Sequence, residues 1–520
     1  MRGGRVTAIS TMPAHAGMPG ASDRGANSPR FAALLALAAL LFTAPRLWLH
    51  ELWRDEAWLW IVATGSPTLP DLLHDLSRSG QGYLFPLLCW GVARLSDAPQ
   101  AMQLLNLAIV VVSAYVLARW APLRRLECVL LVFGYYLAYE YAVLSRHYAL
   151  GMLLVFVACA ALRERRSPVL FGLALGLLCQ TTVYGFILAL TLGFAAIVLH
   201  LRQRAVPPLH WRQIAWAAAL AVAGGIAGLI QLIPESGTPF AVGWTFRWDA
   251  ARAIETLHVP WRAILPVLQP QVQAWNSDIL ANHPAWRATG GVLALALVTL
   301  ILWPRKVALL LFAVGAAGLL GFAYIKYVGT MRHHGHLWLL VPMALWLGGG
   351  LADRATRRTW REWLFLAVLA VHAAAMTFVS VMDLRHPFSN GERTAERIRA
   401  RGFDTLPLLG YREPPAASVA LPLRQPLYAP SRRIYATHTD WGPLQRDLTR
   451  QELRCAVRAF ALQEGRDAIL VMAQRLPAWP EIRLEEEILG AMVPSENYVL
   501  YRVVFDALPD TATGLHCESP

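Results

Sequence analysis

The feature that most constrains this chain is a series of long apolar stretches with few or no charges. A hydrocarbon core about 30 Å thick is crossed by roughly 17–25 residues of helix, and stretches of about this length recur along most of the sequence. Nine of them are expected to be single membrane spans, at 31–49, 102–118, 126–142, 147–162, 213–233, 288–303, 307–325, 336–352 and 363–382. The pattern predicts a polytopic α-helical membrane protein.

Two other apolar segments do not have the length of a single span. Residues 168–201 are too long for one span, and the polar break Gln180-Thr181-Thr182 predicts a tight helical hairpin there. This hairpin brings the total to about eleven transmembrane helices. Residues 83–95 are apolar over only 13 residues, and counting them as a span would place the later Arg clusters outside. We therefore interpret 83–95 as an interfacial helix.

Positive charges set the expected orientation, because Lys and Arg are enriched on the cytoplasmic side of membrane proteins. If the chain starts inside, 19 Lys and Arg fall in segments predicted to be cytoplasmic, namely 1–30, 119–125, 163–167, 202–212, 304–306 and 353–362. The composition, 56% hydrophobic and 16% charged, excludes a soluble enzyme. A nucleic-acid-binding protein is not expected, because its basic residues would cluster on one soluble face.

Composition also divides the chain into domains. Residues 1–30 suit a disordered cytoplasmic tail, and residues 31–383 form the transmembrane domain. Residues 384–520 have balanced charge and contain the patterns of a polar helix and two strands, at 392–401, 467–473 and 497–505. We predict that they form a C-terminal α/β domain in the periplasm. Cys455 and Cys517 are its only cysteines, and whether they are bridged stays open.

The first predicted outside loop carries an acidic pair, Asp55 and Glu56, between Trp53 and Trp58. Adjacent carboxylates next to a span are costly unless they serve a function. Asp55 could act as a general base toward an acceptor hydroxyl or amine, and Glu56 could position the acceptor or a cation. The alternative is an ordinary solvated loop with interfacial Trp anchors.

Two further outside segments carry cations. Arg146 and His147 begin a helix that returns to the cytoplasm, and a guanidinium there suits a phosphate, which it binds bidentately. The alternative is an Arg146 side chain that reaches the lipid headgroups. Lys326, Arg332 and His333 form a second anion-binding candidate. A zinc site is the other chemical interpretation of this histidine-rich segment, but no spacing in it matches a defined metal motif.

An acid and two basic clusters on one side of the membrane suit group transfer from a phosphate-linked donor. A base would activate the acceptor while cations stabilise the leaving phosphate. The sequence has no Walker loop and no GxGxxG fingerprint, so a nucleotide donor is not expected. A lipid phosphate that arrives through the bilayer is the remaining donor class.

With these residues, the chain resembles the GT-C superfamily of membrane glycosyltransferases, near the protein O-mannosyltransferases and the lipid A aminoarabinose transferase. The resemblance rests on the Asp55-Glu56 pair after the first span, on a multi-span body with an outer domain, and on residues 145–150. That segment, SRHYAL, is similar to the family's Arg-x-Tyr-Ala-Leu pattern. The chain departs from the family at residues 81–86 and at 180–182, where histidines are common, which leaves the metal and the acceptor open.

The resemblance implies a glycosyltransferase of the bacterial inner membrane, in which Asp55 is the catalytic base. The expected partners are a polyprenyl-phosphate-linked sugar, a periplasmic acceptor (glycan, lipid or protein) and the lipid bilayer. No cofactor is predicted with certainty, and a divalent metal is left open. One alternative is a transporter or flippase, which inverted repeats and charges near the bilayer midplane would favour. The other is a lipid-linked polysaccharide polymerase or ligase, which would use a diphosphate-linked donor.

Overall fold

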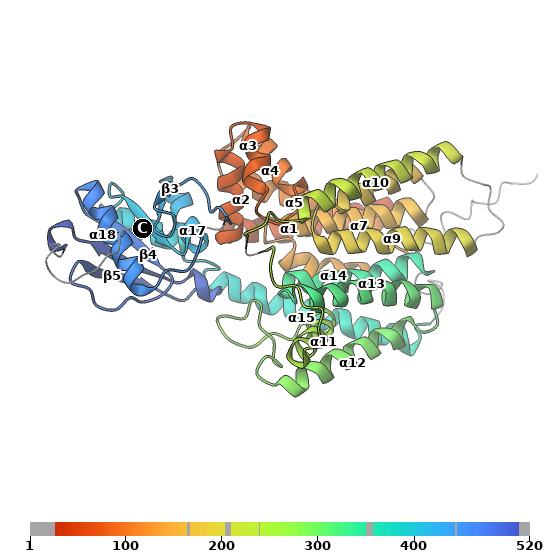
Figure 1. Cartoon of the computed structure of the whole chain (residues 1–520). Coiled ribbons are helices and arrows are strands. Elements are labelled where there is room, and N and C mark those ends of the chain that lie inside the picture. The colour runs from red at the N-terminus through yellow and green to blue at the C-terminus, as the bar shows by residue number, and fades with distance from the viewer. Residues whose placement is uncertain are drawn as a thin grey trace, which may run out of the picture.

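The computed structural model describes residues 27–163, 167–202, 210–238, 240–349, 357–442 and 445–508. A helical bundle carries a sheet domain at one end (Figure 1), and we call this end of the bundle the domain side. Among the described residues, seven helices are long and apolar enough to cross a membrane. They are α1 (Pro29–Leu49), α5 (Gln100–Trp120), α9 (Val183–Arg202), α10 (Trp211–Leu232), α12 (Pro284–Leu302), α13 (Lys306–Ile325) and α15 (Trp360–Arg385).

Shorter helices occupy the other predicted spans. They are α6 (Arg125–Val132), the π-helix η1 (Tyr136–Glu140), α7 (His147–Arg163), α8 (Pro168–Leu178) and α14 (Met331–Leu347). The break between α8 and α9 falls at the polar residues that predicted a hairpin. The polytopic α-helical fold is therefore confirmed, and the count of eleven crossings stays a prediction. The predicted N-terminal tail lies outside the described residues up to position 26, and α1 begins at Pro29.

Segments predicted to be cytoplasmic meet at the end of the bundle opposite the domain. The Glu362 carboxylate at the start of α15 lies 3.6 Å from the Arg124 guanidinium and 3.8 Å from that of Arg305. Glu127 of α6 pairs with Arg358 at 3.0 Å. These contacts join the loops before α6, α13 and α15. The loops therefore share one end, and the side of the membrane on which that end lies stays a prediction.

Short helices fill the space between the bundle and the domain. They are α2 (Arg54–Gly65), α3 (Leu69–Leu76) and α4 (Leu84–Ala93), and a further helix, α11 (Ala250–Ile264), precedes α12. Figure 1 shows α2, α3 and α4 projecting from the bundle beside the domain. Helix α4 lies where the sequence predicted an interfacial helix. Helix α2 packs against both α4 and α17 (Glu413–Leu423) of the domain, so it links the two parts of the chain.

The C-terminal domain is a six-stranded mixed sheet with the strand order β3-β2-β1-β4-β6-β5. Its strands are β1 (Leu408–Tyr411), β2 (Leu427–Ala429), β3 (Ile434–Ala436), β4 (Ala468–Met472), β5 (Ile482–Ile488) and β6 (Tyr498–Val503). Helices α16 (Gly391–Ala400) and α17 cover one face, and α18 (Arg450–Glu464) covers the other. The polar helix and the two strands expected from the sequence are α16, β4 and β6. Cys517 lies outside the described residues.

Candidate active site at the start of helix α2

Asp55 stands in the first turn of α2 with its carboxylate accessible. Its side chain is 28% exposed, and one oxygen accepts a hydrogen bond from Arg332 Nη2 at 3.2 Å. The other carboxylate oxygen lies 3.8 Å from Nε of the neighbouring Arg54. The acid predicted to be a general base is thus reachable from solvent and lies between two guanidinium groups.

The Arg332 side chain comes from the first turn of α14 and is held on several sides. Its guanidinium lies 4.9 Å from the ring centroid of Trp53 and 5.9 Å from that of Trp275. Arg332 Nε donates to the hydroxyl of Tyr148 at 3.2 Å. Aromatic faces attract such a cation without neutralising it. The orientation of Arg332 is therefore fixed while its positive charge remains available to an anion.

Arg146 approaches the same residue from the segment before α7. Its Nη1 donates to the backbone carbonyl of Asp55, and its Nη2 donates to Gln81 Oε1 at 3.0 Å. Arg146 and Arg332 therefore meet at Asp55 from segments that are far apart in the sequence. With Arg54 beside them, three guanidinium groups lie around this residue, two next to its carboxylate and one at its backbone carbonyl. The excess positive charge makes this place attractive to a second anion, such as a phosphate.

Glu56 has the opposite surroundings to Asp55, since it is completely buried. One of its oxygens accepts from the Ser145 amide at 2.6 Å, and the other accepts from the Trp53 amide at 3.4 Å. The second oxygen also lies 3.4 Å from Nε2 of His50. Each contact of Glu56 fixes the start of α2 against its surroundings. The predicted role as an acceptor-orienting group is not supported by this geometry, because the carboxylate faces the protein interior.

His50 carries the charge that balances Glu56. Burial lowers the pKa of His50, but the carboxylates of Asp383 and Glu56 raise it to about 10. His50 Nδ1 lies 3.4 Å from Asp383 on α15, at the domain end of that helix. A protonated imidazole therefore joins the end of α1, the start of α2 and the end of α15. No pattern in the sequence predicted a role for His50.

The two predicted histidines, His147 and His333, both contact Tyr148. The His147 ring centroid lies 4.3 Å from that of Tyr148, and His333 Nε2 lies 3.2 Å from the Tyr148 hydroxyl. His333 Nδ1 accepts from the Thr330 amide at 2.9 Å. Tyr148 thus connects both histidines to Arg332. The only sequence signal for this tyrosine was its place in the SRHYAL segment.

Lys326 is the one predicted site residue that the structure does not bring to the Asp55 cluster. Its ammonium group donates to the backbone carbonyls of Phe240, at 2.7 Å, and Val242. It also lies 4.9 Å from the ring centroid of Trp244. The predicted contact between Lys326 and a donor phosphate is not supported, because the ammonium is bound to a different loop.

The histidine-rich segment does not have the arrangement of a zinc site. His334 Nε2 donates to the Val328 carbonyl at 3.0 Å, and His336 Nδ1 donates to the His333 carbonyl at 2.9 Å. These imidazoles therefore serve separate backbone groups. Across the residues that the structure describes, no three His, Cys, Asp or Glu side chains converge in a way that could hold a metal ion.

The C-terminal domain also contacts the start of α2. Glu496 Oε1 accepts from the Arg54 amide at 3.4 Å, and its other oxygen accepts from hydroxyls of the domain, including Ser418 at 2.8 Å. Burial raises the pKa of Glu496 to about 7. Trp58, one turn further along α2, donates its indole N–H to the Thr439 carbonyl at 3.0 Å. The position of Asp55 therefore depends on the domain, although Arg54 and Glu496 lie 442 residues apart.

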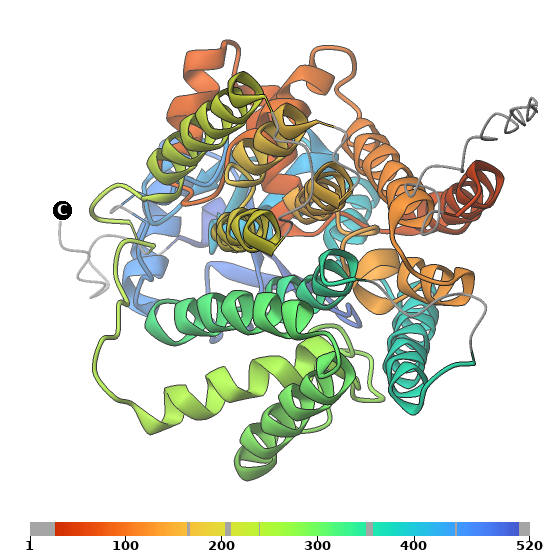
Figure 2. The same ribbon diagram turned by 90° about the vertical axis from the view of Figure 1, so that its right-hand side faces the viewer.

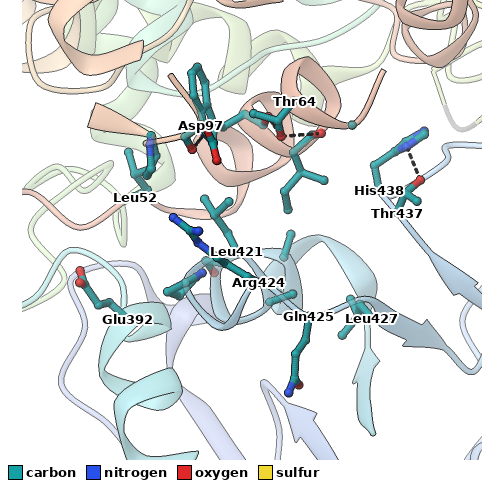
Figure 3. Close-up of a pocket in the computed structure, with 18 of the residues that line it drawn as sticks. Leu52, Thr64, Asp97, Glu392, Leu421, Arg424, Gln425, Leu427, Thr437 and His438 are labelled. Carbon is teal, nitrogen blue, oxygen red and sulfur yellow. Dashed lines mark hydrogen bonds between the residues drawn. The ribbon is translucent and has the colours of Figure 1, made fainter. Parts of the chain in front are cut away.

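A cavity of about 890 Å³ lies beside the second half of α2, between that helix, the start of α5 and the domain. Figure 3 shows Thr64 and Asp97 on one wall, with Arg424 and Gln425 of the domain facing them. None of the seven predicted site residues lines this cavity. Helix α2 therefore has two distinct surroundings, a charged cluster at its start and an open cavity along its later turns.

Comparison with known proteins identifies the fold. The chain is similar to the solved structure of ArnT from Cupriavidus metallidurans in the apo state, with a TM-score of 0.50 and 14% identity over 92% of this chain and 99% of that chain. ArnT from the same organism bound to undecaprenyl phosphate gives a TM-score of 0.49 and 13% identity with the same coverage. No family model and no curated protein matches the chain. The likeness to the apo structure shows an ArnT-like fold.

Proposed function

We propose that this chain is an integral membrane glycosyltransferase that moves a sugar from a polyprenyl-phosphate donor to an acceptor on the domain side. The observation that carries the proposal is the accessible carboxylate of Asp55, which pairs with the Arg332 guanidinium from α14, while the Arg146 guanidinium from the segment before α7 holds the backbone carbonyl of the same residue. Group transfer from a phosphate donor needs a base for the acceptor and positive charge for the leaving group. Both are found here around one residue.

The proposed reaction is a single displacement that inverts the anomeric carbon. Asp55 takes the proton from an acceptor hydroxyl or amine as that group forms a bond to the anomeric carbon. The bond between this carbon and the phosphate oxygen breaks, and the electron pair leaves with the polyprenyl phosphate. Arg332 and Arg146 hold the negative charge that develops on the phosphate. Tyr148 and the two tryptophans next to Arg332 keep its guanidinium in place.

The Arg332–Asp55 ion pair suits this reaction because the donor phosphate can replace the Asp55 carboxylate as the partner of Arg332. A phosphate competes with the Asp55 carboxylate for the Arg332 guanidinium, and a guanidinium binds a phosphate bidentately. Donor binding would therefore draw Arg332 away from Asp55 and leave the carboxylate free to accept a proton. Glu56, His50 and Glu496 do not contact the reactants in this proposal. They hold the start of α2 so that Asp55 keeps its position.

The experiment that tests this function uses the full chain in lipid nanodiscs. Radiolabelled sugars are offered as polyprenyl monophosphate and as polyprenyl diphosphate donors, together with an envelope extract as the source of acceptors. The proposal expects label in the extract from a monophosphate donor, with release of polyprenyl phosphate. Transfer only from diphosphate donors would instead identify a polymerase or ligase. Movement of the intact donor across a vesicle membrane without transfer would identify a transporter.

A further inference from the structure

The loop between α10 and α11 exposes several large apolar side chains. At every second position from 240 to 248 the side chain is apolar and exposed. The exposed fractions are 37% for Phe240, 68% for Val242, 55% for Trp244, 80% for Phe246 and 79% for Trp248. We call residues 240–248 the aromatic segment. The chain turns at Gly243, where φ is 90°, and the rings of Trp244 and Phe246 stack with their centroids 6.1 Å apart, so exposed apolar side chains lie next to each other along this segment.

The backbone of the aromatic segment is fastened to the domain-side end of α13. The Thr245 amide donates to the carbonyl of Ile325, the last residue of α13, at 2.8 Å. Lys326 donates to the carbonyls of Phe240 and Val242, and the Tyr324 hydroxyl donates to the Arg247 carbonyl at 2.8 Å. The end of α13 therefore satisfies polar backbone groups of the segment. Phe240 packs against Trp441 of the domain, and Trp244 and Trp248 lie beside Lys326 and Tyr324. Val242, Phe246 and Trp248 remain the most exposed of the five side chains.

This attachment fixes the height of the segment relative to the membrane. Helix α13 has 20 residues, which makes it about 30 Å long and matches the hydrocarbon core. The segment also follows α10, whose most apolar stretch is only 11% buried within the protein and so faces lipid over most of its surface. Figure 2 shows the connection from α10 to α11 running along the outside of the molecule, past the end of α13.

We propose that the aromatic segment lies in the lipid headgroup region of the domain-side leaflet and anchors the protein there. Aromatic side chains are enriched at this level because their rings suit the boundary between hydrocarbon and water. Exposed apolar surfaces of this size mark an interaction surface, and the lipid leaflet is the partner that continues from the two spans on either side. Lys326 then has a structural role, since it ties the segment to the span.

The anchor also sets the height of the candidate active site. The ring of Tyr327, two residues beyond Ile325, has its centroid 5.4 Å from that of His333, the residue after Arg332. The Asp55 cluster is thus linked to the level of the headgroups through a short series of contacts. This last point rests on the proposed function, whereas the anchor itself does not.

The test places a spin label at Phe246→Cys in the full chain and measures its collision rates with oxygen and with a water-soluble nickel complex in nanodiscs. The four free cysteines that the structure describes are buried, and the spectrum of the unsubstituted chain supplies the background. Leu293→Cys, in the middle of α12, gives the lipid reference, and Leu462→Cys, on α18, gives the water reference. Both positions are exposed, at 61% and 52%.

If the segment is anchored in the headgroup region, the ratio of the oxygen collision rate to the nickel collision rate at residue 246 should be well above the ratio at residue 462. It should be closer to the ratio at residue 293. Val242→Cys is a second, independent exposed position of the segment and should give the same result. A ratio at both positions equal to that at 462 would overturn the proposal. In that case the apolar surface faces water and is available to a protein or glycan partner. Because no donor or acceptor is used, failure of this test leaves the proposed function untouched.

Discussion

The start of α2 and the end of α13 look alike in the sequence but have different structures. Each places charged residues beside tryptophan or tyrosine at the end of a predicted span. At α2, the Asp55 carboxylate meets the Arg332 guanidinium and the Asp55 backbone carbonyl meets that of Arg146, both from distant segments. At α13, Lys326 meets only backbone carbonyls and a ring of the aromatic segment. A charged residue next to a span thus becomes a candidate for chemistry when opposite charges converge on it from elsewhere in the fold.

The largest expected effect is that of Asp55→Asn. This change keeps the size and hydrogen bonding of the side chain but removes its ability to accept a proton at neutral pH. Turnover should fall roughly 100-fold or more, the scale on which general base catalysis contributes, while donor affinity is kept or rises, because the carboxylate no longer competes with the donor phosphate for Arg332. Asp404→Asn in the domain is the matched control and should keep normal turnover. Near-normal turnover in folded Asp55→Asn would make Asp55 an ordinary loop residue.

Replacing Arg332 should have the next largest effect. Arg332→Ala removes a charged hydrogen-bond donor worth about 1.5–3 kcal/mol, so we expect donor affinity to fall by about 10-fold to 100-fold. Arg332→Lys keeps the charge without the planar fork and should give an intermediate loss. Binding of a labelled polyprenyl phosphate to the protein in nanodiscs measures both. Unchanged binding in the alanine variant would remove Arg332 from the phosphate site.

The buried His50, which pairs with Glu56 and Asp383, should affect how the stability of the protein depends on pH. The pKa of His50 is about 10 in the folded protein and 6.5 in a free histidine. Its contribution to the free energy of unfolding is therefore complete below pH 6.5 and is lost as the pH rises toward 10, by up to ~1.4 kcal/mol for each pH unit. Glu56→Gln removes one of the two carboxylates and lowers the folded pKa of His50, so the loss should be smaller and should end at a lower pH. Thermal unfolding of the purified chain between pH 6 and 10 measures this, and identical pH profiles for the two proteins would contradict it.

The smallest effect is expected for Lys326, which completes the comparison. Lys326→Met keeps the length of the side chain and removes its charge. Donor affinity should change less than about twofold, because surface positions away from a charged site contribute little. The same binding measurement as for Arg332 checks this. A loss as large as that of Arg332→Ala would show that the sequence-based assignment of Lys326 to the phosphate site was correct.

Much of the fold followed from the sequence because apolar length and charge position are local properties. The hairpin at 180–182, a short helix within 83–95 and two of the six strands of the domain could be predicted in this way. The interfacial position of the helix stays a prediction. The pairing of Asp55 with Arg332 was not predicted, but the sequence placed both residues on the same side of the membrane, where opposite charges attract each other.

The supporting contacts could not be predicted in the same way. Glu496 and Arg54 are 442 residues apart, and no local pattern marks either residue. Glu56 looks like Asp55 in the sequence, and only the Ser145 amide and the His50 ring distinguish the two carboxylates. Lys326 was assigned to the phosphate site by its charge alone, while its partners lie in a loop more than 80 residues earlier in the chain.

The central claim is that Asp55 and Arg332 act together in one reaction centre. A double-mutant cycle of Asp55→Asn and Arg332→Ala, measured as turnover with a polyprenyl-phosphate sugar at saturating donor, tests it most directly. Residues that act as a unit give strongly non-additive losses. We predict that the double variant is about as slow as the slower single variant. A loss equal to the product of the two single losses would show that the two residues work independently, and it would contradict this account.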